Sequence, residues 1–366
     1  MNLPLFLDAY GRQAFYGGRC EVYGNPLPHE KILHFDFKGM YGKCMGESLP
    51  SGGYTVKNVS SINSPGFYKI RYRSNLTIPV LPFKKDKLYF CNGTSEGLFW
   101  FEEIILFTEM GGEVLEVFFM IECTEYTPSL ESFSKKLAAL RDVSHFNNII
   151  CKFIINSLYG RLGFSKKTER TYICFNESEL DKFDSFAKCD DFFIVKDFVA
   201  NRNSNVLIAA SIASKARIRL YRAMVLIVKW GGRVLHVDTD SIIAAFDKKS
   251  EVLDVDLGGG IFFDSSLEST VIESACFAGG KTYSLVLKSG KTITKLSGVK
   301  NNIDFKEFFY CFYNHKNLEV NIFHTSKKNF TFKGKKSTRV YNLNLYKKRV
   351  FSYDRSTSTA LDFSTL

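Results

Sequence analysis

The sequence predicts an α+β fold in which an antiparallel sheet carries acidic side chains. An apolar, β-branched run over residues 234–243 is interrupted by Asp238-Thr239-Asp240, a pattern typical of a hairpin with a tight turn. A second short apolar run, residues 31–37, has the composition of a buried strand and carries Asp36 near its end. Apolar residues at helical spacing over 142–164 and 206–229 supply the helical part.

Other segments predict the remaining order of elements. Residues 50–126 are rich in strand-forming residues, and residues 68–73 alternate apolar with basic side chains, which predicts a strand with a basic outer face. Thr127-Pro128 predicts the N-cap and first turn of a helix that runs through Leu140. The apolar stretch 206–230 contains five Lys or Arg, so we interpret it as an amphipathic core helix and not as a membrane span.

The two acidic strand ends indicate a metal site. Asp36, Asp238 and Asp240 can meet across one sheet, and Mg²⁺ usually takes one or two carboxylates together with substrate phosphates. A pair of such ions can clamp the attacking and leaving oxygens of a phosphoryl transfer. An ordinary acidic turn is the alternative for Asp-x-Asp alone, and the second acidic strand end favours the metal site.

The helix predicted over 142–164 has two distinct faces. Its polar face contains two amides, one Lys and one Tyr but no acid, which favours a ligand-binding face over a solvated one. A Lys suits a triphosphate and a Tyr ring can pack on a base or sugar. The polar face is formed by Asn148, Lys152, Asn156 and Tyr159, and the apolar face by Phe146, Ile149, Ile150, Phe153, Ile154 and Leu158.

Together these segments resemble the polymerase half of family B DNA polymerases, most closely the protein-primed branch found in phages and linear mitochondrial plasmids. Six motifs occur in the family's order. They are Phe15-Tyr16-Gly17-Gly18 for Y-x-G-G, the stretch from Asp36 to Gly42 for D-x-x-S-L-Y-P, Lys152 to Gly160 for K-x-x-x-N-S-x-Y-G, Asp238 to Ser241 for D-T-D-S, Lys281-Thr282-Tyr283 for K-x-Y, and Lys295 to Gly298 for Lys-x-x-Gly. Phe15, Gly39 and Gly42 depart from the motifs, and the two glycines could loosen the turn beside the nucleotide.

The resemblance implies a right-hand polymerase with palm, fingers and thumb, an antiparallel palm sheet and fingers made of a helical hairpin. The expected division is 1–30 as a linker and template-contact segment, 31–126 as palm with a first insertion region, 127–164 as fingers, 165–203 as a second insertion region, 204–299 as palm and 300–366 as thumb.

The resemblance also implies a role for each motif residue. Asp36, Asp238 and Asp240 would be catalytic, and Asp36, Asp240 and the backbone carbonyl of Phe37 would hold two Mg²⁺ ions, with Mn²⁺ as the alternative. Tyr41, as a steric gate against ribonucleotides, would bind the nucleotide with Lys152, Asn156 and Tyr159. The residues expected to contact DNA are Tyr16, Gly17, Gly18, Ser157, Gly160, Thr239, Lys281, Tyr283, Lys295, Lys335, Lys336 and Arg339.

The amino-acid composition is that expected of a protein that binds a polyanion. The net charge is +11, and residues 327–349 contain nine Lys or Arg and no acid, interleaved with aromatics, which favours a phosphate-tracking surface over a merely solvated one. Nine scattered cysteines without a C-x-x-C pair indicate reduced thiols in a non-secretory compartment.

We therefore expect a DNA-directed DNA polymerase that acts as a monomer on template-primer DNA and dNTPs, with a terminal priming protein as a further partner. The surplus of Phe and Tyr over Trp and Pro suggests an AT-rich gene, hence a linear plasmid or organellar element in a mitochondrion. Too few residues precede Asp36 for the family's exonuclease, so we expect none. The alternatives are an inactive remnant that binds DNA or a terminal protein, and a reverse transcriptase, whose aromatic-x-Asp-Asp turn the sequence lacks.

Overall fold

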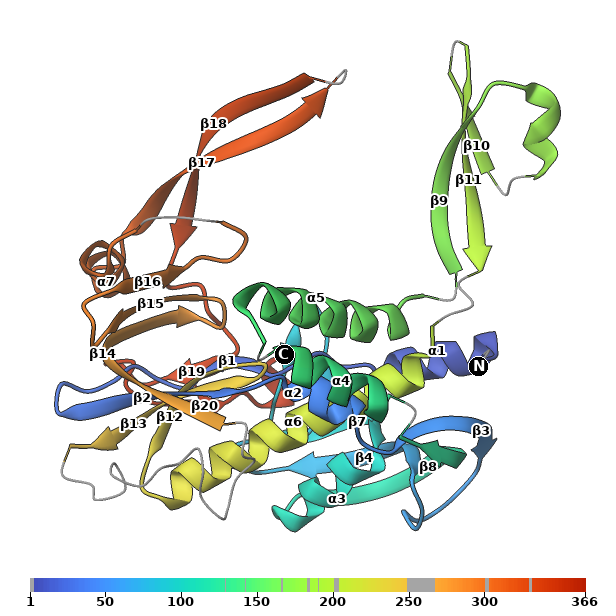
Figure 1. The fold of residues 1–366 in the computed structure, drawn as a ribbon. Helices are drawn as coiled ribbons and strands as arrows, with labels where there is room; N and C mark the ends of the chain where they lie inside the picture. The colour runs from blue at the N-terminus through green and yellow to red at the C-terminus, as the bar shows by residue number, and fades with distance from the viewer. Residues whose placement is uncertain are drawn as a thin grey trace.

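The fold is that of a computed structural model, which describes residues 3–128, 130–141, 143–165, 167–182, 185–189, 191–200, 204–248, 267–299, 303–328 and 331–366. Within these ranges the side chains of 167–170, 181–182, 185, 196–200, 267–269, 323–328 and 331–336 lie outside the description. A central antiparallel sheet and a second antiparallel sheet share one long helix, and two hairpins project on the side that carries another helix, α5 (Figure 1).

The central sheet brings the two acidic strand ends together. Within the described part of the chain its strand order is β1-β12-β13-β2-β14-β15-β16, with every neighbouring pair antiparallel. The predicted hairpin at Asp238 and the predicted strand at Asp36 are thus confirmed as neighbours. The strands are β1 (Cys20–Val22), β2 (Glu30–Phe37), β12 (Arg233–Asp238), β13 (Ser241–Asp247), β14 (Leu267–Gly279), β15 (Thr282–Leu287) and β16 (Thr292–Lys295).

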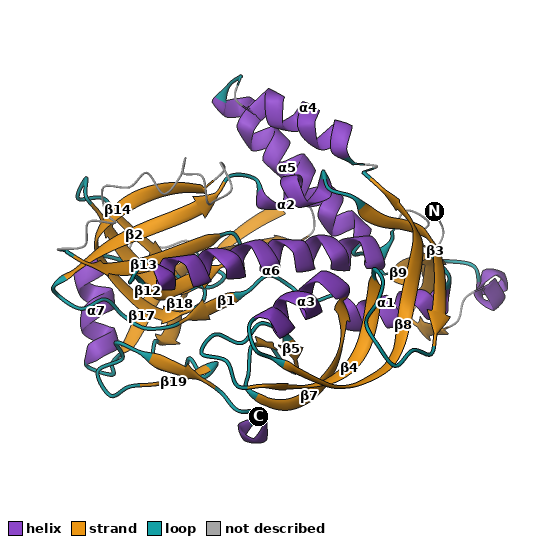
Figure 2. Ribbon diagram, turned by 90° about the horizontal axis from the view of Figure 1, so that it is seen from below, coloured by secondary structure: helices purple, strands orange, loops and turns teal. Residues whose placement is uncertain are grey.

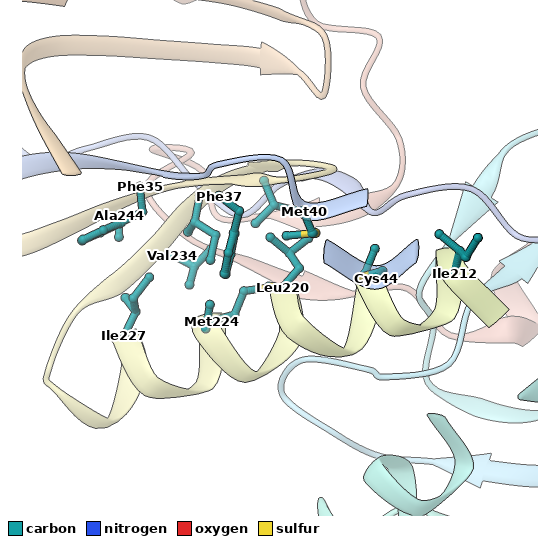
Figure 3. Close-up of a cluster of buried hydrophobic side chains, with 14 of the residues drawn as sticks. Phe35, Phe37, Met40, Cys44, Ile212, Leu220, Met224, Ile227, Val234 and Ala244 are labelled. Atoms are coloured by element: carbon teal, nitrogen blue, oxygen red, sulfur yellow. The ribbon is translucent and has the colours of Figure 1, made fainter. Parts of the chain in front are cut away.

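The helix α6 (Val206–Lys229) packs across one face of this sheet (Figure 2). It begins where predicted, because the Asn205 side chain accepts hydrogen bonds from two backbone N–H groups of the first turn. Phe37 of β2 meets Leu220 and Met224 of α6 in the core beneath the acidic strand ends (Figure 3). Burial of each such side chain contributes roughly 1.5–3 kcal/mol, so this interface holds the strands that carry the carboxylates.

A second sheet with strand order β3-β8-β4-β7 lies at the other end of α6 (Figure 2). The predicted alternation in β4 is confirmed, since Tyr68, Ile70 and Tyr72 are fully buried. Its basic face is neutralised by acids of β7 and β8, including Arg71 with Glu96 at 2.8 Å. The elements here are α1 (Leu5–Ala14), β3 (Leu49–Lys57), β4 (Gly66–Ser74), β5 (Phe83–Lys84), β6 (Leu88–Tyr89), β7 (Gly93–Trp100), α3 (Phe101–Glu109) and β8 (Glu113–Thr127).

The helices α4 (Glu131–Arg141) and α5 (His145–Leu162) form the expected helical hairpin. The predicted start of the first helix is wrong, because Thr127 ends β8 in register with Leu49 and the helix begins at Glu131.

The apolar face expected on α5 is largely exposed. Phe146 and Phe153 are 70% and 72% exposed, and Ile149 and Ile150 are also exposed. The helix touches the core along a side that overlaps the expected face only at the partly buried Ile154 and Leu158 and that also includes the buried Cys151 and Ile155.

The two projecting hairpins rise on the same side of the molecule as α5 (Figure 1). One consists of β9 (Lys167–Cys174), η1 (Glu177–Lys182), β10 (Ser185–Lys188) and β11 (Phe193–Ala200), and the other of β17 (Asn317–Lys328) and β18 (Thr331–Asn342), above α7 (Phe305–Tyr313). The predicted domain boundaries remain predictions.

The C-terminal segment returns to the second sheet. It contains β19 (Arg349–Phe351), β20 (Ser358–Ala360) and η3 (Phe363–Thr365). Phe363 packs on Tyr72 and Phe83, with ring centroids 6.1 and 5.0 Å away, and Asp362 bridges to Asn92. Among the described residues, no helix combines the length and hydrophobicity that a membrane crossing needs.

Candidate functional site

The Asp238-Thr239-Asp240 turn is held against the end of β2. Asp238 and Ser241 pair across the hairpin, and the N–H of Asp240 donates to the carbonyl of Asp238 at 2.7 Å. Thr239 adopts a φ of 67°, which is costly for a β-branched residue. The N–H of Phe37 donates to the carbonyl of Asp240 at 2.9 Å, and Asp36 pairs with Ser241. This geometry places Asp240 beside Asp36.

The clustered carboxylates repel one another. Burial raises the pKa of Asp240, the charge of Asp36 raises it further, nearby Lys152 lowers it, and Asp238 adds a smaller upward shift. The pKa of Asp240 is raised in spite of Lys152, so the negative charge next to Asp240 is only partly offset, which favours a bound cation there.

The donor chemistry of the site fits Mg²⁺. Among the described residues, no group of three or more His, Cys, Asp or Glu side chains already forms a cage for one ion. Mg²⁺ does not need such a cage, because it is commonly held by one or two carboxylates plus waters and substrate phosphates. Cys20 lies beside Asp238, but burial raises its pKa to about 12 and keeps it a neutral thiol, so it does not compete as a soft ligand.

The segment before β1 is fastened to this turn. The N–H of Thr239 donates to the carbonyl of Arg19 at 2.7 Å. A β-carbon on Gly18 would lie 2.7 Å from Thr239 Cγ2, whereas a β-carbon on Gly17 would meet nothing within 4 Å. Tyr16, expected to contact DNA, has a buried ring that stacks on Phe99, so its side chain is not available to a ligand.

Two buried ion pairs behind this segment were not expected from the sequence. The guanidinium of Arg217 binds Glu103 at 2.7 Å and donates to the carbonyl of Tyr16 at 2.8 Å. Arg19 binds Glu21 at 2.7 Å. The interpretation of α6 as amphipathic is wrong for Lys215 and Arg217, which are buried. The sequence did contain one indication of these buried cations. Glu102 and Glu103 lie within an apolar run, and acids that become buried need cationic partners.

The nucleotide-binding candidates lie on α2 (Met40–Met45) and α5. Lys152, Asn156 and Ser157 are exposed, and Gly160 faces open space. The ring of Tyr41 packs on the ring of Tyr159 with centroids 4.6 Å apart. Burial raises the pKa of both phenols, so both are neutral at physiological pH.

The two glycines that depart from the family motif lie where the turn after β2 closely approaches the helical hairpin. Gly39 has a φ of 64°, and a β-carbon there would lie 2.5 Å from Arg141 Nη1. A β-carbon on Gly42 would lie 3.3 Å from Ile155 of α5. Arg141, which sequence reasoning missed, also donates to the Asn148 side chain at 3.2 Å. It therefore links the turn after β2 to the polar face of α5.

The primer-side candidates are Lys281 in the turn between β14 and β15, Tyr283 in β15 and Lys295 in β16. Lys281 Nζ lies 3.4 Å from Asp238 Oδ1. The ring of Tyr283 is buried, and Lys295 Nζ lies 5.4 Å from its centroid. Arg339 lies over Tyr341, whereas the side chains of Lys335 and Lys336 fall outside the described residues.

Comparison with known proteins identifies the family. The model of "DNA polymerase type B, organellar and viral" matches residues 4–231. The chain belongs to this family. It is 26% identical to a probable DNA polymerase of Podospora anserina, covering 87% of this chain and 30% of that protein. It is also 27% identical to the DNA-directed DNA polymerase of Enterobacteria phage PRD1, and this match covers 76% of this chain and 50% of that protein. The chain thus spans only 30–50% of the length of these relatives.

A solved structure shows the same fold. The Phi29 DNA polymerase complexed with primer-template DNA and incoming nucleotides superposes with a TM-score of 0.70 at 16% identity, covering 92% of this chain and 63% of that one. The predicted α+β right-hand polymerase fold is confirmed.

Proposed function

We propose that this chain is a DNA-directed DNA polymerase, which adds deoxynucleotides to a primer 3′ end by a two-metal mechanism. The observation that carries the proposal is the meeting of Asp36 and Asp240 where β2 joins the hairpin turn, in a chain of this polymerase family. The fold alone would not suffice, because one fold hosts many functions.

The proposed roles follow from the charges around the turn. Asp36 and Asp240, with the carbonyl of Phe37, would hold the ions. When bound, two divalent ions would activate the primer 3′-hydroxyl and neutralise charge that develops on the phosphates. Lys152 lies close enough to lower the pKa of Asp240 and would pair with the triphosphate. Lys281, at Asp238, would hold the primer end.

The decisive test replaces Asp240 and leaves the fold intact. Asp240→Asn should abolish primer extension with Mg²⁺, because an amide removes a charged ligand, while affinity for template-primer DNA stays nearly unchanged. Asp247→Asn, at the opposite end of the same strand, is the matched control and should extend normally. Near-normal extension by Asp240→Asn would contradict the metal assignment. DNA binding without extension by the wild-type chain would favour an inactive remnant.

We further propose that Tyr41 excludes ribonucleotides. Its ring is fixed by Tyr159 and cannot move freely away from a nucleotide sugar. Tyr41→Val should lower the preference for dNTP over rNTP in single-nucleotide incorporation, and the exposed Tyr353→Val should not. Unchanged selectivity in Tyr41→Val would reject the gate.

The cellular setting is also a proposal. Relatives in Podospora anserina, Neurospora intermedia and phage PRD1 support replication of a plasmid, organellar or viral element, with a mitochondrial plasmid and a protein primer as the specific case. Transfer of a dNMP to a candidate terminal protein, without a DNA primer, would support protein priming. Failure of every candidate to accept a nucleotide would argue for DNA primers.

A further inference from the structure

His236 occupies an unusual place for a histidine, since it is 1% exposed in the core of the central sheet. It lies on β12, two residues before Asp238. Its ring stacks on Phe277 with centroids 5.0 Å apart and planes at 12°, and it meets the edge of Tyr283 at 5.0 Å. These two neighbours belong to β14 and β15, so His236 faces the hairpin that carries Lys281.

The ring makes one directed hydrogen bond. His236 Nε2 lies 2.8 Å from the carbonyl oxygen of Gly280. A carbonyl only accepts, so Nε2 carries the hydrogen and donates. Burial lowers the pKa of His236 to about 4, which keeps the ring neutral at physiological pH. Nδ1 is buried and has no hydrogen-bond partner among the described residues. The bond to Gly280 is therefore the one hydrogen bond that the side chain makes within the described part of the chain.

The bond fixes the residue that precedes Lys281. Gly280 and Lys281 form the turn between β14 and β15, where Gly279 pairs with Thr282. Lys281 Nζ in turn lies 3.4 Å from Asp238 Oδ1. Because residues two apart on a strand share a face, His236 and Asp238 hold two consecutive residues of the same turn.

We propose that His236 is a positioning residue for the primer end: its hydrogen bond to Gly280 sets the turn that carries Lys281 relative to Asp238. The inference rests on the proposed function, in which Lys281 holds the primer terminus. Without this bond the carbonyl of the half-buried Gly280 loses its hydrogen bond to β12, and the turn can shift relative to that strand.

Two substitutions separate the ring from the hydrogen bond. His236→Phe keeps the aromatic stack on Phe277 and removes the donor, whereas His236→Gln loses the ring but retains an N–H within similar reach of Gly280. We expect His236→Phe to raise the KM for template-primer about tenfold, with the KM for dNTP unchanged. His236→Gln should recover most of the loss. A purely space-filling histidine would give the opposite order, with Phe tolerated and Gln impaired, and would overturn the proposal.

A double-mutant cycle tests whether His236 acts through Lys281. The double variant His236→Phe/Lys281→Met should bind template-primer no worse than Lys281→Met alone, because the turn then has no cation to position. His236→Phe combined with Lys152→Met should instead show the sum of the two effects. Additive losses with Lys281→Met would overturn the proposal. If Lys281→Met weakens primer binding but His236→Phe does not, only this inference fails, whereas normal primer binding by Lys281→Met refutes the proposed role of Lys281 itself.

Discussion

Gly18 shows how the absence of one side chain places the Asp238-Thr239-Asp240 turn. Thr239 fills the space that a β-carbon on Gly18 would need, and its N–H is bound by the neighbouring Arg19 carbonyl. Thr239 also holds a strained φ, so this support is what keeps the carboxylates on either side of it in place.

We therefore predict that Gly18→Ala lowers the single-turnover rate of extension on the order of tenfold to a hundredfold, since small displacements of reacting groups have effects of that size. Gly17→Ala makes the same chemical change in open space and should keep the wild-type rate. Rapid-quench measurement with saturating template-primer isolates the chemical step. Equal losses in both variants would show that the effect comes from DNA contact and not from the turn.

At the scale of elements, α6 connects the two sheets through charge as well as through apolar packing. Arg217 of α6 binds Glu103 of α3 with both side chains buried, and the same guanidinium reaches the Tyr16 carbonyl. Removing one partner of such a pair leaves an uncompensated charge in the core.

Arg217→Met should therefore cost about 3–5 kcal/mol of unfolding free energy. Arg71→Met removes an exposed cation that also bridges two strands through acids, and it should cost less than about 1 kcal/mol. Urea titration of both variants provides the comparison. Similar losses in the two would mean that the buried pair is worth no more than a surface one.

The elements that could be predicted from the sequence are those in which the hydrophobic residues of the segment are also the residues that are buried in the fold. The hairpin at Asp238 and the helix α6 meet this condition, because each is a continuous apolar run and each is buried on most sides. The burial of the Tyr16 ring and the choice of Arg217 as the partner of Glu103 could not be predicted, since each depends on a residue more than eighty positions away. The exposed Phe153 could not be predicted either. Periodicity predicts which residues share a face of a helix, but it does not predict whether another element covers that face.

At the scale of the molecule, basic side chains from distant segments meet beside the Asp238-Thr239-Asp240 turn. A cavity of about 410 Å³ is lined by Lys87 near β6, Lys281 in the β14–β15 turn, and Lys347 and Lys348 before β19. No acidic residue is found among its described lining residues, and Lys348 reaches the carbonyl of Cys20, the β1 residue opposite Asp238. A nucleic-acid strand that ends at Asp238 would pass these ammonium groups, so Lys87 and Lys281 add to the basic segment at 327–349, to which Lys347 and Lys348 belong.

This arrangement predicts a steep and separable salt dependence of DNA binding. Each neutralised phosphate contributes about −0.9 to the slope of log K against log salt on duplex DNA, so Lys87→Gln, Lys347→Gln and Lys348→Gln together should flatten the slope by about 2.7. Over a fourfold rise in salt, that change corresponds to about 40-fold less loss of affinity than in the wild type. The same charge is removed by Lys229→Gln, Lys288→Gln and Lys291→Gln, which lie outside the cavity, and this triple variant should keep the wild-type slope. Fluorescence anisotropy with one template-primer across a salt series measures all three proteins. Equal flattening in both variants would assign the salt dependence to net charge alone, because only local contacts can make two variants of the same charge differ.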